Sequence, residues 1–319
     1  MAQEPPIIET HALTRDFKKT RAVDSLNLSI QPGELFGLVG PDGAGKTTTL
    51  RLLAGLLDIT SGKAEVAGYD LAHQAEAVKR KIGYMAQRFS LYGELSVMEN
   101  LRFFADLYDV DATELPEHME QLLAFAGLTE FKSRRAAQLS GGMQKKLALA
   151  CTLIHRPEIL LLDEPTTGVD PVSRREFWDI LTNLHLEGTT ILVSTPYMDE
   201  ADRCSWVGLL YEGHMIVCAG PQQIRAQVKG ELIELHPNDW QAAYSLVETL
   251  PGVLEVQTYG ELLHVLVDSA EKRLPEIEAA LNKHGLAYSG ARRARARMEE
   301  AFISLITRLE ASQIPGKEE

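Results

Sequence analysis

The feature that most constrains the fold is a glycine-rich segment, Gly40–Thr47, which fits the pattern G-x-x-x-x-G-K-[ST]. The apolar run Leu35–Val39 precedes it and has the length of a short strand. The stretch Lys46–Leu56 follows with apolar residues at helical spacing, and Gly55 is its one breaker. A strand, a glycine-rich turn and a helix in this order form a phosphate-binding loop. We therefore expect an α/β fold built around a nucleoside triphosphate site.

The residue types of the loop indicate its chemistry. Gly43 and Gly45 let the backbone come close to phosphates, and the following helix presents its N-terminal N–H groups to the anion. Lys46 is expected to bridge the β- and γ-phosphates, and Thr47 to bind Mg²⁺. A chance glycine-rich turn is the alternative, and the matching strand and helix on either side argue against it.

A second apolar run, Ile159–Leu162, ends in the acids Asp163 and Glu164. Asp163 is expected to hold Mg²⁺ through water, and Glu164 to polarise the attacking water. The alternative is a buried strand that ends in two solvated acids. The phosphate-binding loop elsewhere in the chain favours the magnesium interpretation.

Between these elements lies Leu139–Gln144, with the sequence LSGGMQ. It resembles the signature of ABC-type ATPases, which in that family reaches across a dimer interface to the nucleotide held by the other subunit. Gln87 resembles the Q-loop glutamine, Thr167–Asp170 resembles the D-loop, and Phe17 falls where the family places an aromatic ring on adenine. Alone, Gln87 would be taken for a surface glutamine, and Phe17 is equally well explained as a core aromatic. The set in its correct order carries the resemblance.

The resemblance implies a P-loop NTPase fold of ABC type with a helical signature subdomain, and ATP and Mg²⁺ as cofactors. It implies catalytic roles for Glu164 and Gln87, with position 196 as the third member of that set. It implies Mg²⁺ contacts from Thr47, Gln87 and Asp163. The nucleotide contacts that it implies are Phe17, Gly40, Pro41, Asp42, Gly43, Ala44, Gly45, Lys46, Thr47, Thr48, Ser140, Gly141, Gly142, Met143 and Asp170.

The resemblance covers roughly residues 8–220 and is greatest to ATP-binding subunits of ABC-2-type exporters, which carry drugs or lipid-like substrates. Residues 91–101 and 164–171 suggest that group. The implied partners are membrane-spanning permease subunits and a second ATP-binding subunit. The expected location is the cytoplasmic face of the inner membrane, with attachment through the permease.

The chain departs from the family at the switch histidine, whose position holds Pro196. Proline has neither a side-chain donor nor a backbone N–H for the γ-phosphate. Loss of one preorganised donor commonly costs roughly 10²–10³ in turnover. A heterodimer with an intact second chain is therefore favoured over a homodimer. The alternative is that Pro196 is only a turn residue and that Thr195 or Tyr197 supplies the contact.

A second departure is Asp42, where the family usually has asparagine. An acid beside the phosphates would weaken nucleotide binding slightly, unless it points away or pairs with a cation. An outward-facing side chain is the favoured interpretation.

The net charge of −13 argues against nucleic acid as a partner. The six N-terminal residues lack the basic region and apolar core of a signal peptide, and no apolar run is long enough to span a bilayer. Cys151, Cys204 and Cys218 are few and scattered, which fits a reduced chain without a disulfide framework or a zinc site.

The pattern along the chain predicts an ATPase domain over residues 1–225, with a helical subdomain at about 88–140. Strand, helix, two strands and a helix follow over 226–312, which predicts a small accessory α+β domain with a ferredoxin-like arrangement as a candidate. Residues 313–319 are expected to form a loose tail.

The basic run Arg292, Arg293, Arg295 and Arg297 is interpreted as a solvated helix or loop face, with contact to an acidic partner or lipid headgroups as the alternative.

Three functions are compatible with these motifs. The favoured one is the motor of an ABC exporter. A soluble ABC ATPase that acts on DNA or ribosomes ranks lower, because the chain has one cassette and no sustained heptads. A nucleotide-gated regulatory subunit with little hydrolysis is the third, and Pro196 is its main support.

Overall fold

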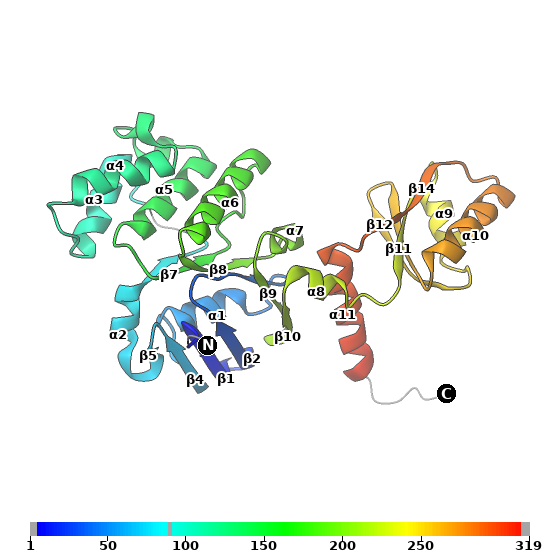
Figure 1. Cartoon of the computed structure of the whole chain (residues 1–319), viewed down its shortest axis with the longest axis horizontal. Helices are drawn as coiled ribbons and strands as arrows, with labels where there is room; N and C mark the ends of the chain where they lie inside the picture. The colour runs from blue at the N-terminus through cyan, green and yellow to red at the C-terminus, as the bar shows by residue number, and fades with distance from the viewer. Residues whose placement is uncertain (1–4, 89–90, 314–319) are drawn as a thin grey trace. The chain divides into compact units, whose positions relative to one another are not determined.

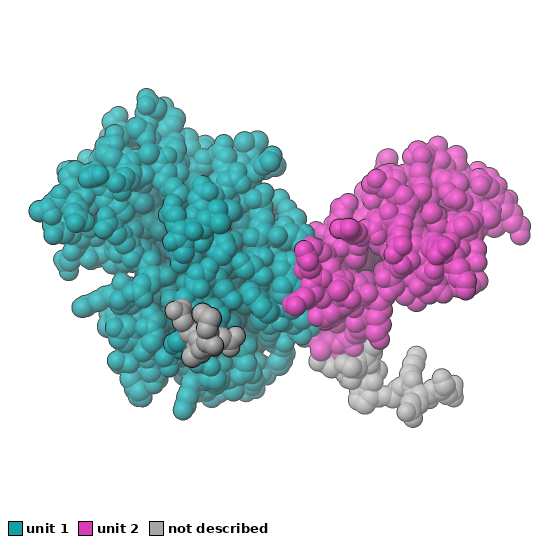
Figure 2. Space-filling model, in the orientation of Figure 1, with its two compact units in different colours: residues 1–221 teal, residues 222–319 magenta. Residues whose placement is uncertain are grey.

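The computed structural model describes residues 5–88 and 91–313. The chain divides into two compact units, Met1–Pro221 and Gln222–Glu319, which Figure 2 colours separately. The predicted tail, apart from residue 313, lies outside the described residues. No helix within the described part of the chain is long and apolar enough to cross a membrane.

A six-stranded sheet forms the centre of the first unit, in the order β10-β9-β3-β8-β7-β6. Strands β9 to β6 run parallel, and β10 is an antiparallel edge strand. Every residue of β3, β7 and β8 is buried, as expected for a parallel sheet that is covered on both faces. The strands are β3 (Leu35–Val39), β6 (Ile82–Met85), β7 (Ile159–Asp163), β8 (Thr190–Thr195), β9 (Trp206–Tyr211) and β10 (His214–Ala219).

A four-stranded antiparallel sheet, in the order β2-β1-β4-β5, completes the sheet structure of this unit. One apolar core joins it to helix α1 and to the larger sheet, through residues such as Leu13, Leu50 and Leu192. Strands β1 and β2 are long, because their pairing continues through bulges as far as Phe17 and Thr20. The strands are β1 (Ile8–Phe17), β2 (Thr20–Ile30), β4 (Ser61–Val66) and β5 (Tyr69–Asp70).

The helix after the phosphate-binding loop ends at Leu53 and not at the predicted Leu56, because Gly55 has a φ of 63° and ends the helical turn. The helix after the D-loop begins at Pro171, since Asp170 caps it and proline suits the first turn. The helices that flank the sheet are α1 (Lys46–Leu53), α2 (Leu71–Lys81), α6 (Pro171–Leu186) and α7 (Met198–Ala201).

The helical part of the first unit contains α3 (Val97–Leu107), α4 (Leu115–Phe125) and α5 (Gly141–Leu153). Short 3₁₀ turns at Thr129–Phe131 and Ala136–Gln138 connect α4 to α5. These helices pack on one another, and α5 also packs on α6, so that Figure 1 shows them as one group. The signature therefore begins a helix that belongs to this group.

The second unit has the chain order β-α-β-β-α-β and an antiparallel sheet in the order β12-β13-β11-β14. This is the ferredoxin-like arrangement. One apolar cluster lies between the sheet and the helices α9 and α10. The elements are α8 (Pro221–Arg225), which begins at the boundary, then β11 (Glu231–Pro237), α9 (Trp240–Val247), β12 (Val253–Tyr259), β13 (Leu262–Val267), α10 (Ala270–Lys283), β14 (Tyr288–Ala294) and α11 (Met298–Gln313).

The basic run lies partly on a strand, which corrects the prediction of a helix or loop. Arg292 and Arg293 belong to β14 and form ion pairs with Glu234 and Glu231 of the neighbouring strand β11. Strand pairing places these opposite charges across from one another, which the linear sequence does not show.

Candidate nucleotide site

The predicted motifs lie at the carboxyl ends of four neighbouring parallel strands. Val39 pairs with Thr195, Asp163 with Ser194, and Met85 with Leu162. The carboxyl end of the sheet therefore brings together four parts of the site. They are the phosphate-binding loop, the acidic pair, Pro196 and Gln87. Ligands of open α/β sheets bind at this edge.

Three glycines of the phosphate-binding loop are required by its geometry. A Cβ on Gly40 would lie 2.1 Å from the carbonyl oxygen of Leu210, and one on Gly45 would lie 2.4 Å from that of Ala22. Gly43 and Gly45 have φ values of 81° and 104°, which other residues rarely adopt. The loop thus forms a tight backbone turn of the kind that binds anions through N–H groups.

Lys46 lies inside this cradle. Its side chain is 3% exposed, and Nζ donates to the carbonyl oxygens of Gly40 and Pro41 at 2.9 Å each. The same Nζ lies 3.3 Å from Oε1 of Glu164. The loop therefore holds a buried cation where phosphates are expected, and the carboxylate of Glu164 is its counter-ion in this structure.

Asp163 lies beside the loop with one carboxylate oxygen held and the other unpaired. Thr47 Oγ1 and Ser194 Oγ donate to Oδ1 at 2.9 and 2.8 Å, while Oδ2 is buried and has no hydrogen-bond partner among the described residues. A hydroxyl and a free carboxylate oxygen side by side suit a hard divalent cation. No group of three acidic, histidine or cysteine side chains occurs in the described residues. Mg²⁺ takes few protein ligands and completes its shell with water and phosphate oxygens, so Thr47 and Asp163 suit it as protein ligands.

Glu164 is held from several sides. Gln87 Nε2 donates to Oε2 at 2.7 Å, and Thr167 Oγ1 donates to the same oxygen at 3.3 Å. The Glu164 N–H donates to the backbone oxygen and to the hydroxyl of Ser194. Glu164 has a φ of 45°, a strained value for a side chain of this size. The surrounding contacts therefore maintain a backbone strain at the residue that is expected to act on water.

The surroundings of Pro196 bear on which group could replace the missing histidine. The Thr195 hydroxyl donates to Glu200 Oε2 at 2.6 Å and accepts the N–H of Tyr197 at 3.0 Å. The Tyr197 ring lies under the guanidinium of Arg174, 5.0 Å from ring centroid to Cζ. The Thr195 hydroxyl and the Tyr197 backbone N–H are thus engaged with other protein groups, and the Tyr197 ring packs against Arg174.

Glu200 is a residue that the sequence did not reveal. It is 2% exposed, and its carboxylate accepts hydrogen bonds from the hydroxyls of Thr166 at 2.8 Å and Thr195 at 2.6 Å. Arg174 Nε lies 3.8 Å from it. This carboxylate joins the loop after β7, the end of β8 and helix α6. The only signal in the sequence is an acid in a short helical stretch after the strand.

The signature residues lie apart from the phosphate-binding loop of their own chain. Ser140 caps α5 by accepting the N–H of Met143, a Cβ on Gly142 would meet Ser173, and Gly141 faces open space. Among the described residues, no hydrogen bond or ion pair joins positions 140–143 to the loop. The nucleotide contacts predicted for these residues therefore remain a prediction about a second subunit.

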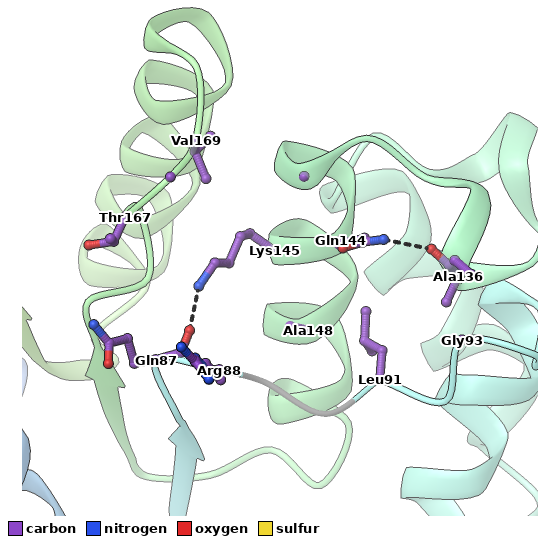
Figure 3. A pocket seen from close by; sticks show the side chains of 13 residues that line it. Gln87, Arg88, Leu91, Gly93, Ala136, Gln144, Lys145, Ala148, Thr167 and Val169 are labelled. Atoms are coloured by element: carbon purple, nitrogen blue, oxygen red, sulfur yellow. Dashed lines mark hydrogen bonds between the residues drawn. The ribbon is translucent and has the colours of Figure 1, made fainter.

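The signature helix instead meets the Q-loop. Lys145 Nζ donates to the carbonyl oxygen of Gln87 at 2.9 Å. Both residues line a cavity of about 270 Å³ between α5 and the D-loop, as Figure 3 shows. Burial lowers the pKa of Lys145, and the nearby carboxylates of Asp163 and Glu164 act in the opposite direction. Nothing in the sequence distinguishes Lys145 from other surface lysines.

Three further predicted residues are exposed. Phe17 is 40% exposed at the end of β1, with Arg15 over its ring. Asp42 is exposed, as the outward-facing interpretation requires. The carboxylate of Asp170 accepts the N–H groups of Ser173 and Val172, and the bond from Ser173 is the main reason that its pKa is lowered. The predicted contacts of these residues with nucleotide remain predictions.

Comparison with known proteins extends these observations. The family model for the ABC transporter domain matches residues 23–167. The Nod factor export ATP-binding protein I of Cupriavidus metallidurans is 35% identical over 90% of this chain and 92% of its own length. The probable multidrug ABC transporter ATP-binding protein YbhF of Escherichia coli is 44% identical over 69% of this chain. The chain spans only 38% of the length of YbhF.

A solved structure shares the fold of the first unit. It is the dimeric ATP-binding cassette MJ0796 in a post-hydrolysis state with ADP and phosphate, which is 26% identical with a TM-score of 0.62. The match covers 67% of this chain and 98% of that chain. The motifs, the geometry and these likenesses agree, and the chain belongs to the ATP-binding proteins of the ABC transporter family.

Proposed function

We propose that this chain binds and hydrolyses ATP to drive an exporter whose membrane-spanning permease subunits are separate chains. The observation that carries the proposal is the contact set of Lys46, Glu164 and Gln87 at the sheet edge. In this set the Lys46 ammonium lies beside the Glu164 carboxylate, whose backbone is strained and whose Oε2 accepts a hydrogen bond from Gln87. The export and multidrug names of the relatives support transport out of the cell. The proposed location of the chain is the cytoplasmic face of the inner membrane.

Each residue of the site has its own role in the proposed hydrolysis of ATP. Lys46 holds the β- and γ-phosphates, and when it does so it releases the carboxylate of Glu164. Glu164 then accepts a proton from the attacking water, while the Gln87 side chain holds Oε2 of Glu164 in position. Thr47 and the free Oδ2 of Asp163 would hold Mg²⁺, which neutralises charge on the phosphate oxygens when bound.

We further propose that this site turns over slowly because of Pro196. The Thr195 hydroxyl donates to Glu200 and the Tyr197 backbone N–H donates to Thr195, so neither of these groups supplies the donor that proline lacks. The expected deficit is roughly 10²–10³ in turnover. The same observation favours the second candidate function, a nucleotide-gated regulatory subunit that barely hydrolyses ATP.

A second ATP-binding chain completes the proposed assembly. The signature residues Ser140–Met143 lie apart from their own phosphate-binding loop, so they are available to the nucleotide of a partner. The relative MJ0796 is a dimer with ADP and phosphate bound. A heterodimer is favoured, because an intact signature here can serve a partner that keeps its histidine.

The first experiment compares the purified wild type with Pro196→His and Glu164→Gln. ATP affinity is measured by calorimetry, and turnover is measured with Mg²⁺ present. We expect all three to bind ATP, Pro196→His to hydrolyse faster than wild type, and Glu164→Gln to be inactive. Brisk wild-type turnover that Pro196→His does not increase would overturn the slow-site proposal. Absence of ATP binding would overturn the function itself.

The second experiment identifies the partners. The chain is tagged in its native membrane, the complex is extracted in detergent, and its subunits are identified by mass spectrometry with their stoichiometry. A permease with one copy each of this chain and of a second ATP-binding chain is expected. Two copies of this chain would overturn the heterodimer.

A further inference from the structure

One cation of the site lies outside every motif described above. Lys145 directly follows the signature, one turn after the start of α5, and its Nζ donates to the Gln87 carbonyl oxygen at 2.9 Å. Figure 3 shows the side chain extending from the helix to the Q-loop across the cavity. Among the described residues this carbonyl is the one hydrogen-bond acceptor of Nζ.

The contact extends a continuous chain of interactions. Lys145 holds the backbone carbonyl of Gln87, and the side-chain amide of the same residue donates to Glu164 at 2.7 Å. Glu164 in turn lies 3.3 Å from Lys46. Gln87 is therefore held at its backbone by the signature helix and at its side chain by the carboxylate that acts on water.

Partial burial of the Lys145 side chain favours its contact with Gln87. Lys145 is only partly exposed, and its ammonium has given up part of its hydration. A charge-assisted bond to a carbonyl compensates for that loss. The ammonium therefore has a physical reason to stay on Gln87 and not to extend into water.

We propose that Lys145 is a positioning residue that fixes Gln87 against Glu164 and makes the signature helix and the Q-loop move together. The proposal rests on the proposed ATPase function. Without the ammonium, the backbone at Gln87 is free to rotate, and its amide leaves the carboxylate. ATP binding itself uses Lys46 and the loop backbone, so it does not depend on Lys145.

A matched control is available one position along the helix. Lys146 carries the same charge, is 15% exposed, and pairs with Glu176 of α6. Lys146→Met therefore removes a charge and an ion pair from α5 without touching the Q-loop. Lys145→Arg keeps a donor that can reach the same carbonyl.

The first test measures single-turnover hydrolysis and ATP affinity. Lys145→Met is expected to lower the rate about 10-fold or more, because a small misplacement of catalytic groups is enough for that. ATP affinity is expected to stay within about twofold, a difference of only about 0.4 kcal/mol. Lys145→Arg is expected to recover most of the rate, and Lys146→Met to lower it less than threefold, or about 0.65 kcal/mol. Equal losses in Lys145→Met and Lys146→Met would overturn the proposal.

The second test needs no hydrolysis, so it separates failure of this proposal from failure of the proposed function. Hydrogen exchange is followed in nucleotide-free protein. Peptides that cover Tyr84–Arg88 are expected to exchange faster in Lys145→Met alone, with α5 unchanged. Unchanged exchange around Gln87, or faster exchange throughout α5, would show that Lys145 only stabilises its helix.

Discussion

Single residues of the site carry charges that compensate one another. Lys46 and Glu164 are both almost fully buried, and each is the other's counter-ion. Removing one partner would leave an uncompensated buried charge, which costs more than the pair itself contributes. Ligand binding therefore has to exchange one buried ion pair for another, and the energy of that exchange is set by individual side chains.

The hydroxyl of Ser194 illustrates how a neighbour supports a site residue. It donates to Asp163 Oδ1 and accepts the N–H of Glu164, so it orients both acids. Ser194→Ala is expected to lower ATP turnover roughly 10–100-fold, as for other residues that orient metal ligands. Steady-state hydrolysis against Mg²⁺ concentration is the measurement, with Thr182→Ala as a distant control. A variant with wild-type turnover would show that Ser194 is dispensable.

Glu200 provides a stability prediction. Glu200→Ala leaves the buried hydroxyls of Thr166 and Thr195 without their acceptor. Each unsatisfied group costs roughly 1–3 kcal/mol, so the free energy of unfolding should fall by about 3 kcal/mol. Glu200→Gln keeps one acceptor and should lose less than half as much. Urea denaturation measures both, and equal losses for the two variants would contradict the hydrogen-bond explanation.

At the scale of elements, helix starts coincide with functional loops. Ser140 caps α5, and Asp170 caps α6. Ser96 forms a capping box with Glu99 at the start of α3. A capped start defines where the helix begins within one residue. The signature and the D-loop are therefore held at rigid positions.

The junction between β13 and α10 gives a pH prediction. Both side-chain oxygens of Asp268 accept hydrogen bonds from Arg273 at 2.8 Å, and this lowers the Asp268 pKa from 3.8 to about 2. A lowered folded-state pKa means that the stabilisation is complete above about pH 4 and is lost as the pH falls toward 2. Carboxyl ¹³C NMR titration measures this pKa. Arg273→Gln should return it toward 3.8, and a wild-type value near 3.8 would refute the pairing.

At the scale of the whole molecule, each unit has its own apolar core. One core cluster lies wholly within residues 7–215, and the other wholly within 233–291. The contact division falls at 221, a few residues before the predicted domain boundary at 225. All the predicted nucleotide contacts lie in the first unit. We therefore propose that the first unit folds and binds nucleotide without the second.

The corresponding prediction concerns a truncated chain. Residues 1–221 alone are expected to fold and to bind ATP within about threefold of the full-length affinity, a difference of about 0.65 kcal/mol. Circular dichroism checks folding, and calorimetry with ATP measures affinity. Full-length protein with Lys46→Ala serves as the control that does not bind. A folded fragment with ATP affinity reduced a hundredfold would show that the second unit contributes to the site.

The sequence alone determined the phosphate-binding loop, the acidic pair and the signature, because each is a short run whose chemistry depends on neighbouring residues. Gly40–Thr47 must form a tight loop wherever it occurs, since only glycine tolerates its backbone angles and close approaches. The first five elements of the second unit, in the order β-α-β-β-α, were also predictable, because strand and helix periodicities are local. The last strand, β14, was not predicted, since its basic residues were interpreted as a helix or loop face.

Tertiary structure alone decided what holds these parts together. Gln87 and Glu164 are 77 residues apart, and Lys145 is 58 residues from the Gln87 carbonyl that it holds. Glu200 reaches Thr166 across 34 residues. Such contacts form only because parallel strands bring their carboxyl ends to one edge, and no local periodicity records which side chains then meet. For the same reason, the hydrogen bond from the Thr195 hydroxyl to Glu200 became visible only in the folded chain.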